Sequence, residues 1–330
     1  EQGSGGSDAE FFSDDAISGE EEEEEEEEPL TPEEEAAEWK QEGNQKYSKK
    51  DYFGAIDAYT KAIELVPEDH TYYGNRSAAN MMIGRYDHVE KDCVKAVELN
   101  RDYTKCYLRL AKARLALGKF DQAEDSLTQL YLRDVRSTDV PNEWKKVSLS
   151  RDRLHRAKQY LDNKKYAHAL SVLHSAQEHC PASPALKEYK VEALVGTKKY
   201  EEAYVLSTNM LRNNPRDPIA LFWRAKAQYY QGEFEKAIQV MKNLMRMDPD
   251  NKKCMIEVRK MRKLETMKQE GNSFLKQRSW TEAISTYTDC LNIDPDNLLF
   301  NAKLLCNRAA CLMKLKRYQE ALADCTNAIE

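Results

Sequence analysis

The amino-acid sequence repeats itself with a period of 34 residues. In each clear copy an aromatic residue is followed by Ala three positions later, and Pro follows twelve positions after that Ala. The clearest copies are the segments Tyr52–Pro67, Tyr166–Pro181, Phe234–Pro249 and Trp280–Pro295. A unit this short cannot bury its own apolar face, so successive copies must stack on one another. The period therefore determines the architecture before any local helix propensity is considered.

Self-similarity at this period is the signature of the tetratricopeptide repeat (TPR), a hairpin of two antiparallel helices. The sequence predicts an all-α TPR solenoid, a right-handed superhelix of helix-turn-helix repeats. The first helix of each hairpin is expected to line a concave groove. A low content of helix-breaking residues supports this prediction, because only 12 Gly and 10 Pro occur in 330 residues.

The repeats group into blocks when the Ala of each copy is numbered position 20. The predicted repeat starts are 36, 70 and 104, then 150, 184 and 218, and finally 264 and 302. Segments 138–149 and 252–263 interrupt this register by 12 residues each, and the second is expected to extend or cap a helix. We therefore predict blocks at 36–149 and 150–263, and a third block at 264–330 that is truncated within its second repeat.

Small residues at positions 8 and 20 are expected to let the two helices of a hairpin approach closely. They form the pairs Gly43 with Ala55, Ala111 with Ala123, and Gly271 with Ala283. Tyr59 and Tyr287 at position 24 are expected to fill the adjacent space. Pro at position 32 is expected to end the second helix, because it lacks a backbone donor.

Charge is divided unequally along the chain. Residues 1–35 contain 17 Asp and Glu and no Lys or Arg, including nine consecutive Glu at 20–28. The remaining residues hold 57 − 17 = 40 acidic groups against 50 basic ones, so this part of the chain is about +10. Like charges repel, and the first segment offers little apolar surface to offset chain entropy. We predict a disordered acidic tail over residues 1–35.

Five groove positions of the first block carry polar side chains that can donate hydrogen bonds. Lys40 and Asn44 are four residues apart on one helix face, Asn75 belongs to the second repeat, and Lys105 and Arg109 are again four apart. Together they supply three cations and two amides without a carboxylate. Charge-assisted hydrogen bonds from the cations suit two adjacent carboxylates. An Asn amide can both donate and accept, which fixes the orientation of a peptide.

These five residues resemble, position for position, the carboxylate clamp of chaperone-binding TPR domains. The resemblance implies a ligand, the C-terminal EEVD tail of cytosolic heat-shock protein 70 and heat-shock protein 90. The third block begins in the same way, with Lys268, Asn272 and Asn307 at matching positions. We interpret these three residues as a partial second clamp, whose remaining cations are expected after residue 330.

The middle block departs from the pattern. Its equivalent positions hold Leu154, Lys158, Tyr189, Ile219 and Trp223, so no carboxylate clamp is predicted there. Two interpretations of the aromatic pair are open. The rings can form an apolar groove surface, or they can pack against neighbouring helices, and we favour the second.

The order of clamp, no clamp and partial clamp resembles the DnaJ homolog subfamily C member 7 family, TPR co-chaperones that also carry a J domain. The phrases that carry the resemblance are "KKDYFGAIDAYTKAI", "YYGNRSAANMMIGRY" and "ALADCTNAIE", and it covers roughly residues 36–330. The resemblance implies a co-chaperone adaptor whose J domain stimulates the ATPase of heat-shock protein 70. No His-Pro-Asp tripeptide occurs in this sequence, so a J domain is expected beyond residue 330.

Other interpretations remain open. The repeats can be the targeting region of an enzyme such as a phosphatase or a prolyl isomerase, which usually carries one clamp block. They can belong to an endoplasmic-reticulum J-protein with nine TPRs, although the partner of that family lacks an EEVD end. A general protein-interaction scaffold is a further alternative.

Several classes of function are not expected. The sequence contains no nucleophile elbow, P-loop or paired acid–base motif, so we predict no enzyme activity, no catalytic residue and no cofactor within it. Neither HExxH nor CxxC occurs, and no metal site is expected. No membrane partner is predicted, because no apolar run approaches about 18 residues. Basic residues are mixed with acids, so no nucleic-acid partner is predicted.

The expected partners are heat-shock protein 70, heat-shock protein 90 and unfolded client proteins, and the expected location is cytoplasmic, with the nucleus as an alternative. Eight scattered cysteines fit a reducing compartment. Cys93 and Cys325 share a repeat position and are expected to be buried as small apolar residues.

Overall fold

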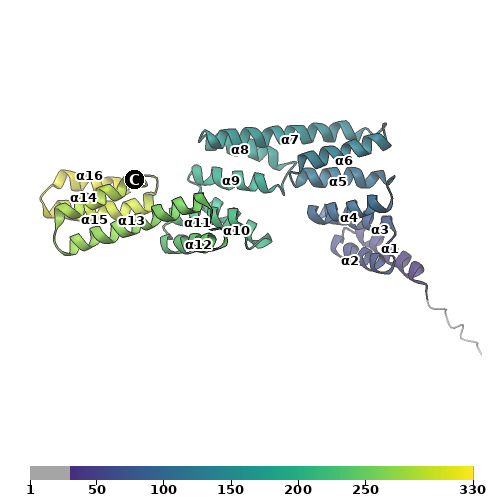
Figure 1. The fold of residues 1–330 in the computed structure, drawn as a ribbon, viewed down its shortest axis with the longest axis horizontal. Coiled ribbons are helices and arrows are strands. Elements are labelled where there is room, and N and C mark those ends of the chain that lie inside the picture. Colours follow the sequence, from purple (N-terminus) through teal and green to yellow (C-terminus); the bar gives the residue numbers. More distant parts are fainter. Residues whose placement is uncertain (1–29, 330) are drawn as a thin grey trace, which may run out of the picture.

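The computed structural model of the chain describes residues 30–329, and every regular element among them is a helix. The helices are α1 (Pro32–Ser48), α2 (Tyr52–Leu65), α3 (His70–Met82), α4 (Tyr86–Leu99), α5 (Thr104–Ala116), α6 (Phe120–Arg133), α7 (Asp139–Asp162), α8 (Tyr166–Gln177), α9 (Pro184–Gly196), α10 (Tyr200–Asn213), α11 (Pro218–Tyr230), α12 (Phe234–Met247), α13 (Lys252–Lys276), α14 (Trp280–Leu291), α15 (Leu298–Lys314) and α16 (Tyr318–Ile329). Successive helices form hairpins that stack into an elongated solenoid (Figure 1). The predicted all-α TPR solenoid is confirmed.

Two helices are much longer than the others, because they include the segments that interrupt the repeat. Helix α13 has 25 residues and takes in residues 252–263, as predicted. Helix α7 has 24 residues and absorbs most of 138–149 in the same way. In Figure 1 each long helix extends from one group of hairpins to the next. Helix α15 begins at Leu298, ahead of the predicted repeat start at 302, and so gains an additional N-terminal turn.

The first helix begins earlier than the sequence predicts. Most of the expected disordered tail, residues 1–29, lies outside the described residues, but Pro32–Glu35 already belong to α1, so the predicted boundary at 35 is wrong. A capping box explains the start. The Thr31 side chain accepts from the Glu34 backbone, and the Glu34 carboxylate accepts from the Thr31 backbone. These bonds satisfy two orphan donors and place three acidic residues at the positive end of the helix dipole.

The turn between the two helices of every hairpin uses a residue with a left-handed backbone. These residues occupy position 15 of all eight units, counted from the predicted starts, and they are Lys50, Gly84, Gly118, Lys164, Lys198, Gly232, Arg278 and Lys316. Glycine adopts this conformation without a Cβ penalty. The five units that carry Lys or Arg there hold a strained residue at the tip of the hairpin.

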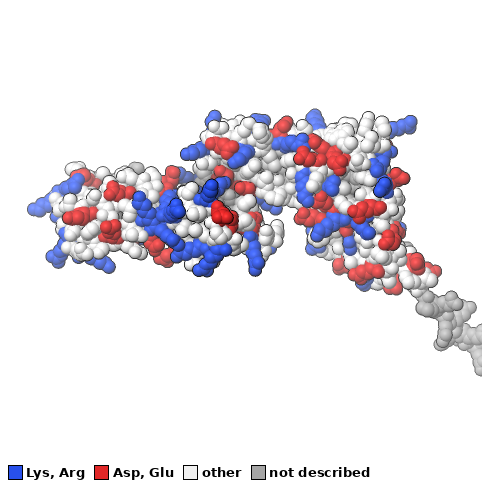
Figure 2. All heavy atoms as spheres, in the orientation of Figure 1, with Lys and Arg blue, Asp and Glu red and all other residues white. Residues whose placement is uncertain are grey.

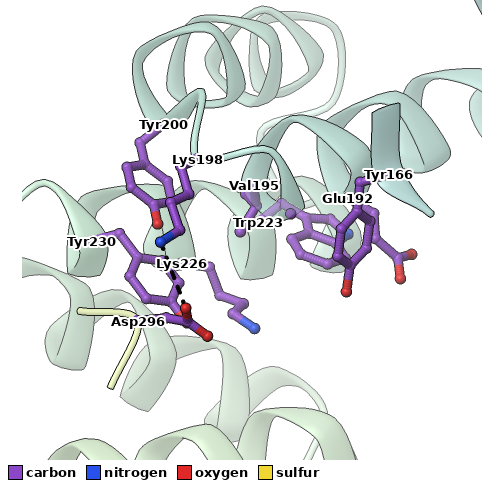
Figure 3. A pocket seen from close by; sticks show the side chains of 10 residues that line it. Tyr166, Glu192, Val195, Lys198, Tyr200, Trp223, Lys226, Tyr230 and Asp296 are labelled. Carbon is purple, nitrogen blue, oxygen red and sulfur yellow. Dashed lines mark ion pairs between the residues drawn. The ribbon is translucent and has the colours of Figure 1, made fainter. Parts of the chain in front are cut away.

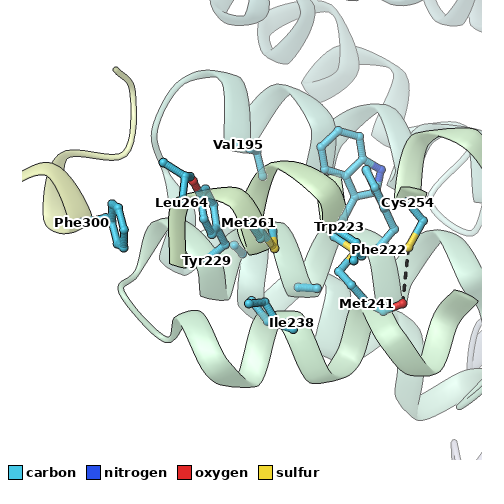
Figure 4. Packing of buried hydrophobic residues seen from close by; sticks show 14 of the residues in the cluster. Val195, Phe222, Trp223, Tyr229, Ile238, Met241, Cys254, Met261, Leu264 and Phe300 are labelled. Atoms are coloured by element: carbon cyan, nitrogen blue, oxygen red, sulfur yellow. Dashed lines mark hydrogen bonds between the residues drawn. The ribbon is translucent and has the colours of Figure 1, made fainter. Parts of the chain in front are cut away.

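The core runs along the solenoid as a chain of connected apolar clusters, and the largest one joins α9 to α15. Figure 4 shows part of it, where Trp223 and Phe222 meet edge to face near Met241 and Cys254. Asp294 also lies in this region, only 6% exposed, and accepts a 2.8 Å hydrogen bond from the Tyr229 hydroxyl. The cluster therefore fixes the hairpins from α9 to α15 as one packed body.

The eight cysteines are unpaired thiols. Two of them, Cys93 and Cys325, share a repeat position and are both expected to be buried. Cys93 is fully buried between α4 and its neighbours, as expected. Cys325 is exposed, so the expectation for this residue is wrong. Its helix, α16, packs mainly against α15, and no further described helix covers the face that would bury the thiol.

Candidate functional site

The five residues of the predicted clamp lie on three helices that are each the first of a hairpin. Lys40 and Asn44 belong to α1, Asn75 to α3, and Lys105 and Arg109 to α5. The Asn75 Nδ2 lies 3.4 Å from the Asn44 Oδ1, so the two amides meet although they are 31 residues apart. The helices thus bring amides from two successive repeats together.

Tyr59 holds the Asn44 amide in place. Its hydroxyl donates a 2.8 Å hydrogen bond to Asn44 Oδ1, and its ring is only 2% exposed. Burial raises the pKa of Tyr59 to about 12, so the hydroxyl keeps its proton and remains a donor at neutral pH. Since Oδ1 accepts from both Tyr59 and Asn75, the Nδ2 group of Asn44 is oriented as a donor.

Gly43 makes this arrangement possible. A Cβ at Gly43 would lie 2.5 Å from Tyr59 Cε1, which is far closer than van der Waals contact. Gly43 is buried, and Ala55 opposite is 0% exposed. The small residues predicted at positions 8 and 20 therefore do bring α1 and α2 together, and the ring of Tyr59 occupies the space that they leave.

The cations of the predicted clamp differ in how firmly they are held. Arg109 is half-buried, and its Nη1 donates to the Gly74 carbonyl at 2.8 Å and to Ser77 Oγ at 2.9 Å. Lys40 is also half-buried, with Nζ 5.6 Å from the centre of the Tyr72 ring. Lys105 is exposed and makes no polar contact with the other described residues. Arg109 is thus a fixed cation next to α3, whereas Lys105 is available to solvent.

A triad of Thr60, Arg76 and Asp92, which is absent from the predicted site, lies directly behind Asn75. Arg76 pairs with Asp92 through two atoms, with Nε–Oδ2 at 3.1 Å and Nη2–Oδ1 at 2.7 Å. Its Nη1 also donates to Thr60 Oγ1 at 3.1 Å. The Asp92 side chain is only 7% exposed. This bidentate contact ties α2, α3 and α4 together and fixes the helix that presents Asn75.

The third block repeats the amide pair held by a tyrosine and the close contact between that tyrosine and a glycine. Tyr287 donates to Asn272 Oδ1 at 2.7 Å, and Asn307 Nδ2 donates to the same oxygen at 3.0 Å. A Cβ at Gly271 would lie 2.6 Å from Tyr287 Cε1. The amide half of the site is therefore built identically in blocks one and three. Lys268 differs slightly, with Nζ 5.3 Å from the ring of Phe300 in the additional turn of α15.

The triad recurs here as well. Arg308 pairs with Asp324 at 2.8 and 2.6 Å, and its Nη1 donates to Thr288 at 2.9 Å. Thr, Arg and Asp occupy positions 25, 7 and 23 of their units in both blocks. That recurrence at matched repeat positions is the sequence signal that would have identified the triad.

The equivalent positions of the middle block make no such site. Leu154 and Trp223 are buried, at 6% and 8% exposure, whereas Ile219 is 38% exposed. Lys158 pairs with Asp162 at 2.9 Å and lies 5.8 Å from the centre of the Tyr189 ring. Trp223 is packed against neighbouring helices, in agreement with the favoured interpretation, while Tyr189 is half-buried.

Two observations restrict other kinds of site. Residues 30–329 contain no group of three or more His, Cys, Asp or Glu placed to hold a metal ion. None of the helices in the same range is both long and apolar enough to cross a membrane. Lys and Arg gather over α11–α13 on the face shown in Figure 2, while both signs of charge mix elsewhere on that face.

Comparison with known proteins agrees with the fold. Models of the tetratricopeptide repeat match residues 105–133, 208–252 and 302–330. The crystal structure of the P58(IPK) TPR domain superposes with a TM-score of 0.58 over 89% of this chain and 92% of that one, at 18% identity. A likeness at this identity concerns the fold alone. The chain thus contains tetratricopeptide repeats and has the fold of a TPR solenoid.

Sequence comparison identifies particular relatives. The human DnaJ homolog subfamily C member 7 is 33% identical over 296 residues, which cover 90% of this chain and 60% of the relative. The homologue from Dictyostelium discoideum is 32% identical over 300 residues, covering 88% of this chain and 55% of the relative. The chain is homologous to DnaJ homolog subfamily C member 7 and spans about 60% of the length of the human protein.

Proposed function

We propose that the protein is a co-chaperone adaptor whose first block binds the C-terminal EEVD peptides of heat-shock protein 70 and heat-shock protein 90. One observation carries the proposal. Asn44 and Asn75 form a hydrogen-bonded amide pair, held by Tyr59 and flanked by cations on α1 and α5. Homology to DnaJ homolog subfamily C member 7 supports the same assignment.

The chemistry of the pair fits a peptide that ends in Asp. Such a peptide presents two carboxylates, its C-terminus and its last side chain. Asn44 Nδ2 and the cations donate to these oxygens, and each charge-assisted bond contributes about 1.5–3 kcal/mol. Ordering the extended peptide offsets much of this gain, so we expect a dissociation constant near the micromolar range, or about −8 kcal/mol.

The third block would supply the two amides of a second peptide-binding site. Asn272, Asn307 and Lys268 repeat the arrangement of Asn44, Asn75 and Lys40, and the buried Tyr287 holds Asn272 in the same way. The two remaining cations would belong to a further repeat. We place the protein in the cytoplasm with its chaperone partners, and we propose that a J domain belongs to the same protein.

Calorimetric titration tests whether the clamp of the first block binds the peptide. An EEVD-terminated peptide is compared with the same peptide carrying a C-terminal amide, which lacks one carboxylate. We expect amidation, K105A and R109A each to weaken binding at least tenfold. K112A is the matched control, because Lys112 lies on the same helix but contacts Glu143 of α7 at 3.8 Å. Equal binding of the free and amidated peptides would remove the clamp from consideration.

A further inference from the structure

The middle block, which lacks a clamp, contains a pocket of about 240 Å³ on the surface of α9 and α11. Figure 3 shows the side chains that line it. Glu192 comes from α9 and Trp223 and Tyr230 from α11, while Tyr166 and Tyr200 begin α8 and α10. The loop between α14 and α15 also contributes to the lining, so the pocket forms where the second and third blocks meet.

The aromatic walls of the pocket are held rigidly. Tyr166 lies directly on Gly196, and a Cβ at this glycine would collide with the tyrosine ring. Tyr200 and Tyr230 stack with ring centres 4.9 Å apart and an angle of 12° between the planes. Trp223 is 8% exposed and therefore cannot swing away. Lys226 Nζ already lies 5.6 Å from the centre of the Trp223 ring, whereas the partly exposed Tyr166 presents a fixed ring face, and aromatic faces attract cations.

The two lysines of the pocket are already engaged with carboxylates. Lys226 Nζ pairs with Glu257 at 3.0 Å, and both side chains are largely buried. Lys198 Nζ lies 3.7 Å from Asp296 Oδ1, an exposed pair that Figure 3 marks. Because both positive charges are paired, the pocket is not arranged to receive an anion.

Glu192 is different. Within residues 30–329 its carboxylate takes part in no hydrogen bond and no ion pair within 4.0 Å, although the side chain is only partly exposed. It lies beside Tyr166 in Figure 3, on the same side of the pocket as Trp223. Burial raises the pKa of Glu192, although Lys158 and Lys253 act in the opposite direction. A partly buried carboxylate with no ion-pair or hydrogen-bond partner, next to the ring of Tyr166, is complementary to a cation from outside.

We propose that this pocket binds an arginine side chain of an extended polypeptide, with the guanidinium paired to Glu192 and stacked on the ring of Tyr166. A guanidinium is planar, so it can stack on a ring and donate to a carboxylate at the same time. Lysine offers a compact, strongly hydrated charge that cannot do both equally well. The middle block would thus read a positive side chain, whereas the first block reads terminal carboxylates.

NMR of the tryptophan indole N–H groups in the complete 330-residue chain tests this inference, because W223F assigns the Trp223 signal among four tryptophans. The probe is a pentapeptide with a central Arg, acetylated and amidated at its ends so that it has no carboxylate for the clamp. A peptide with citrulline in place of Arg keeps the shape without the charge. We expect the Arg peptide to bind at least tenfold more tightly than the citrulline peptide.

Variants separate this site from the clamp. E192Q is expected to reduce binding of the Arg peptide to the level of the citrulline peptide, whereas E178Q, an exposed carboxylate on the preceding hairpin, should leave binding unchanged. K105A should also have no effect, because it acts only on the clamp. Equal binding of the Arg and citrulline peptides to the unmodified chain, or equal binding by E192Q, would overturn the inference and leave the clamp proposal untouched.

Discussion

Arg76 and Asp92 form a bidentate ion pair across α3 and α4, with the closer contact at 2.7 Å. Asp92 is 5% exposed, so the pair sits where water cannot replace a lost partner. Because Arg76 follows Asn75 directly, the pair also determines where the Asn75 amide lies. A buried ion pair thus lies directly next to an amide of the proposed clamp in the first block.

Replacing Asp92 by Asn keeps the size of the side chain but removes its charge. We expect D92N to lower the free energy of unfolding by about 2–3 kcal/mol, since hydrogen bonds to charged groups contribute about 1.5–3 kcal/mol. Chemical denaturation measures the change. D121N is the control, because Asp121 pairs with Arg151 at 2.8 Å but is 97% exposed, and exposed pairs contribute little. Equal losses in D92N and D121N would contradict the structural role of the triad.

A substitution of Tyr59 can test the orientation of Asn44 without changing the packing of the hairpin. Y59F keeps the buried ring and removes the 2.8 Å hydrogen bond to Asn44 Oδ1. We expect EEVD-peptide affinity to fall about fivefold to tenfold, with a loss of stability of about 1 kcal/mol. Calorimetry and thermal unfolding provide the two measurements. The matched control is Y287F, which should leave peptide binding by the first block unchanged while it removes the equivalent bond to Asn272.

The strained hairpin turns predict a simple route to higher stability. Lys164 has a φ of 56°, is exposed, and its side chain forms no hydrogen bond or ion pair within residues 30–329. K164G relieves a left-handed conformation that costs an L-residue about 1–2 kcal/mol, although greater freedom of the unfolded chain offsets part of the gain. We expect a net increase of about 0.5–1 kcal/mol in unfolding free energy. The neighbour Lys165 has an ordinary φ of −88°, so K165G should give no increase.

Glu192 predicts an unusual dependence on pH. Burial raises its pKa, and Glu188 and Asp162 add to this effect, while Lys158 and Lys253 oppose it. A raised pKa in a carboxyl group means that folding favours the protonated form. The stability contributed by Glu192 is therefore greatest below its unfolded pKa and is lost as the pH rises through the folded pKa.

It follows that E192Q should be more stable than the unmodified chain at pH 7, and that this difference should shrink as the pH falls toward 4. Unfolding by urea at several pH values provides the measurement. E178Q again serves as the exposed control, for which a flat difference across the same pH range is expected. A variant E192Q that is less stable at neutral pH would show that the carboxylate is a structural group.

The sequence predicts the solenoid and the members of the amide pair for an identifiable reason. A 34-residue period fixes which residues share a repeat position, and repeat position fixes the face of the helix. On this basis the repeat predicts that Gly43 and Tyr59 pack between the helices, and the structure shows that they do. That Tyr59 also orients Asn44 depends on the direction of one hydroxyl group, which periodicity does not specify.

Other features depend on contacts that the repeat pattern does not encode. The early start of α1 at Pro32 comes from a local capping box. The predicted tail boundary rests on the number of acidic residues, and that number does not distinguish helix-capping glutamates from those of a tail. The exposure of Cys325 reflects a face of α16 without a described neighbour. The Glu192 pocket requires a loop from the third block to lie near α9 and α11, and only the stacking of whole hairpins determines that.

The two long helices have a further consequence for geometry. Helix α13 takes in all 12 residues of its segment and α7 takes in residues 139–149, which add about 3.3 and about 3.1 turns because an α-helix has about 3.6 residues per turn. At α13 the hairpin is thus displaced along the helix axis and turned by about a third of a revolution relative to a simple continuation of the repeat, whereas at α7 the displacement comes with almost no turn. Helices α7 and α13 therefore offset successive blocks from one another, and α13 also changes the direction that the following hairpins face.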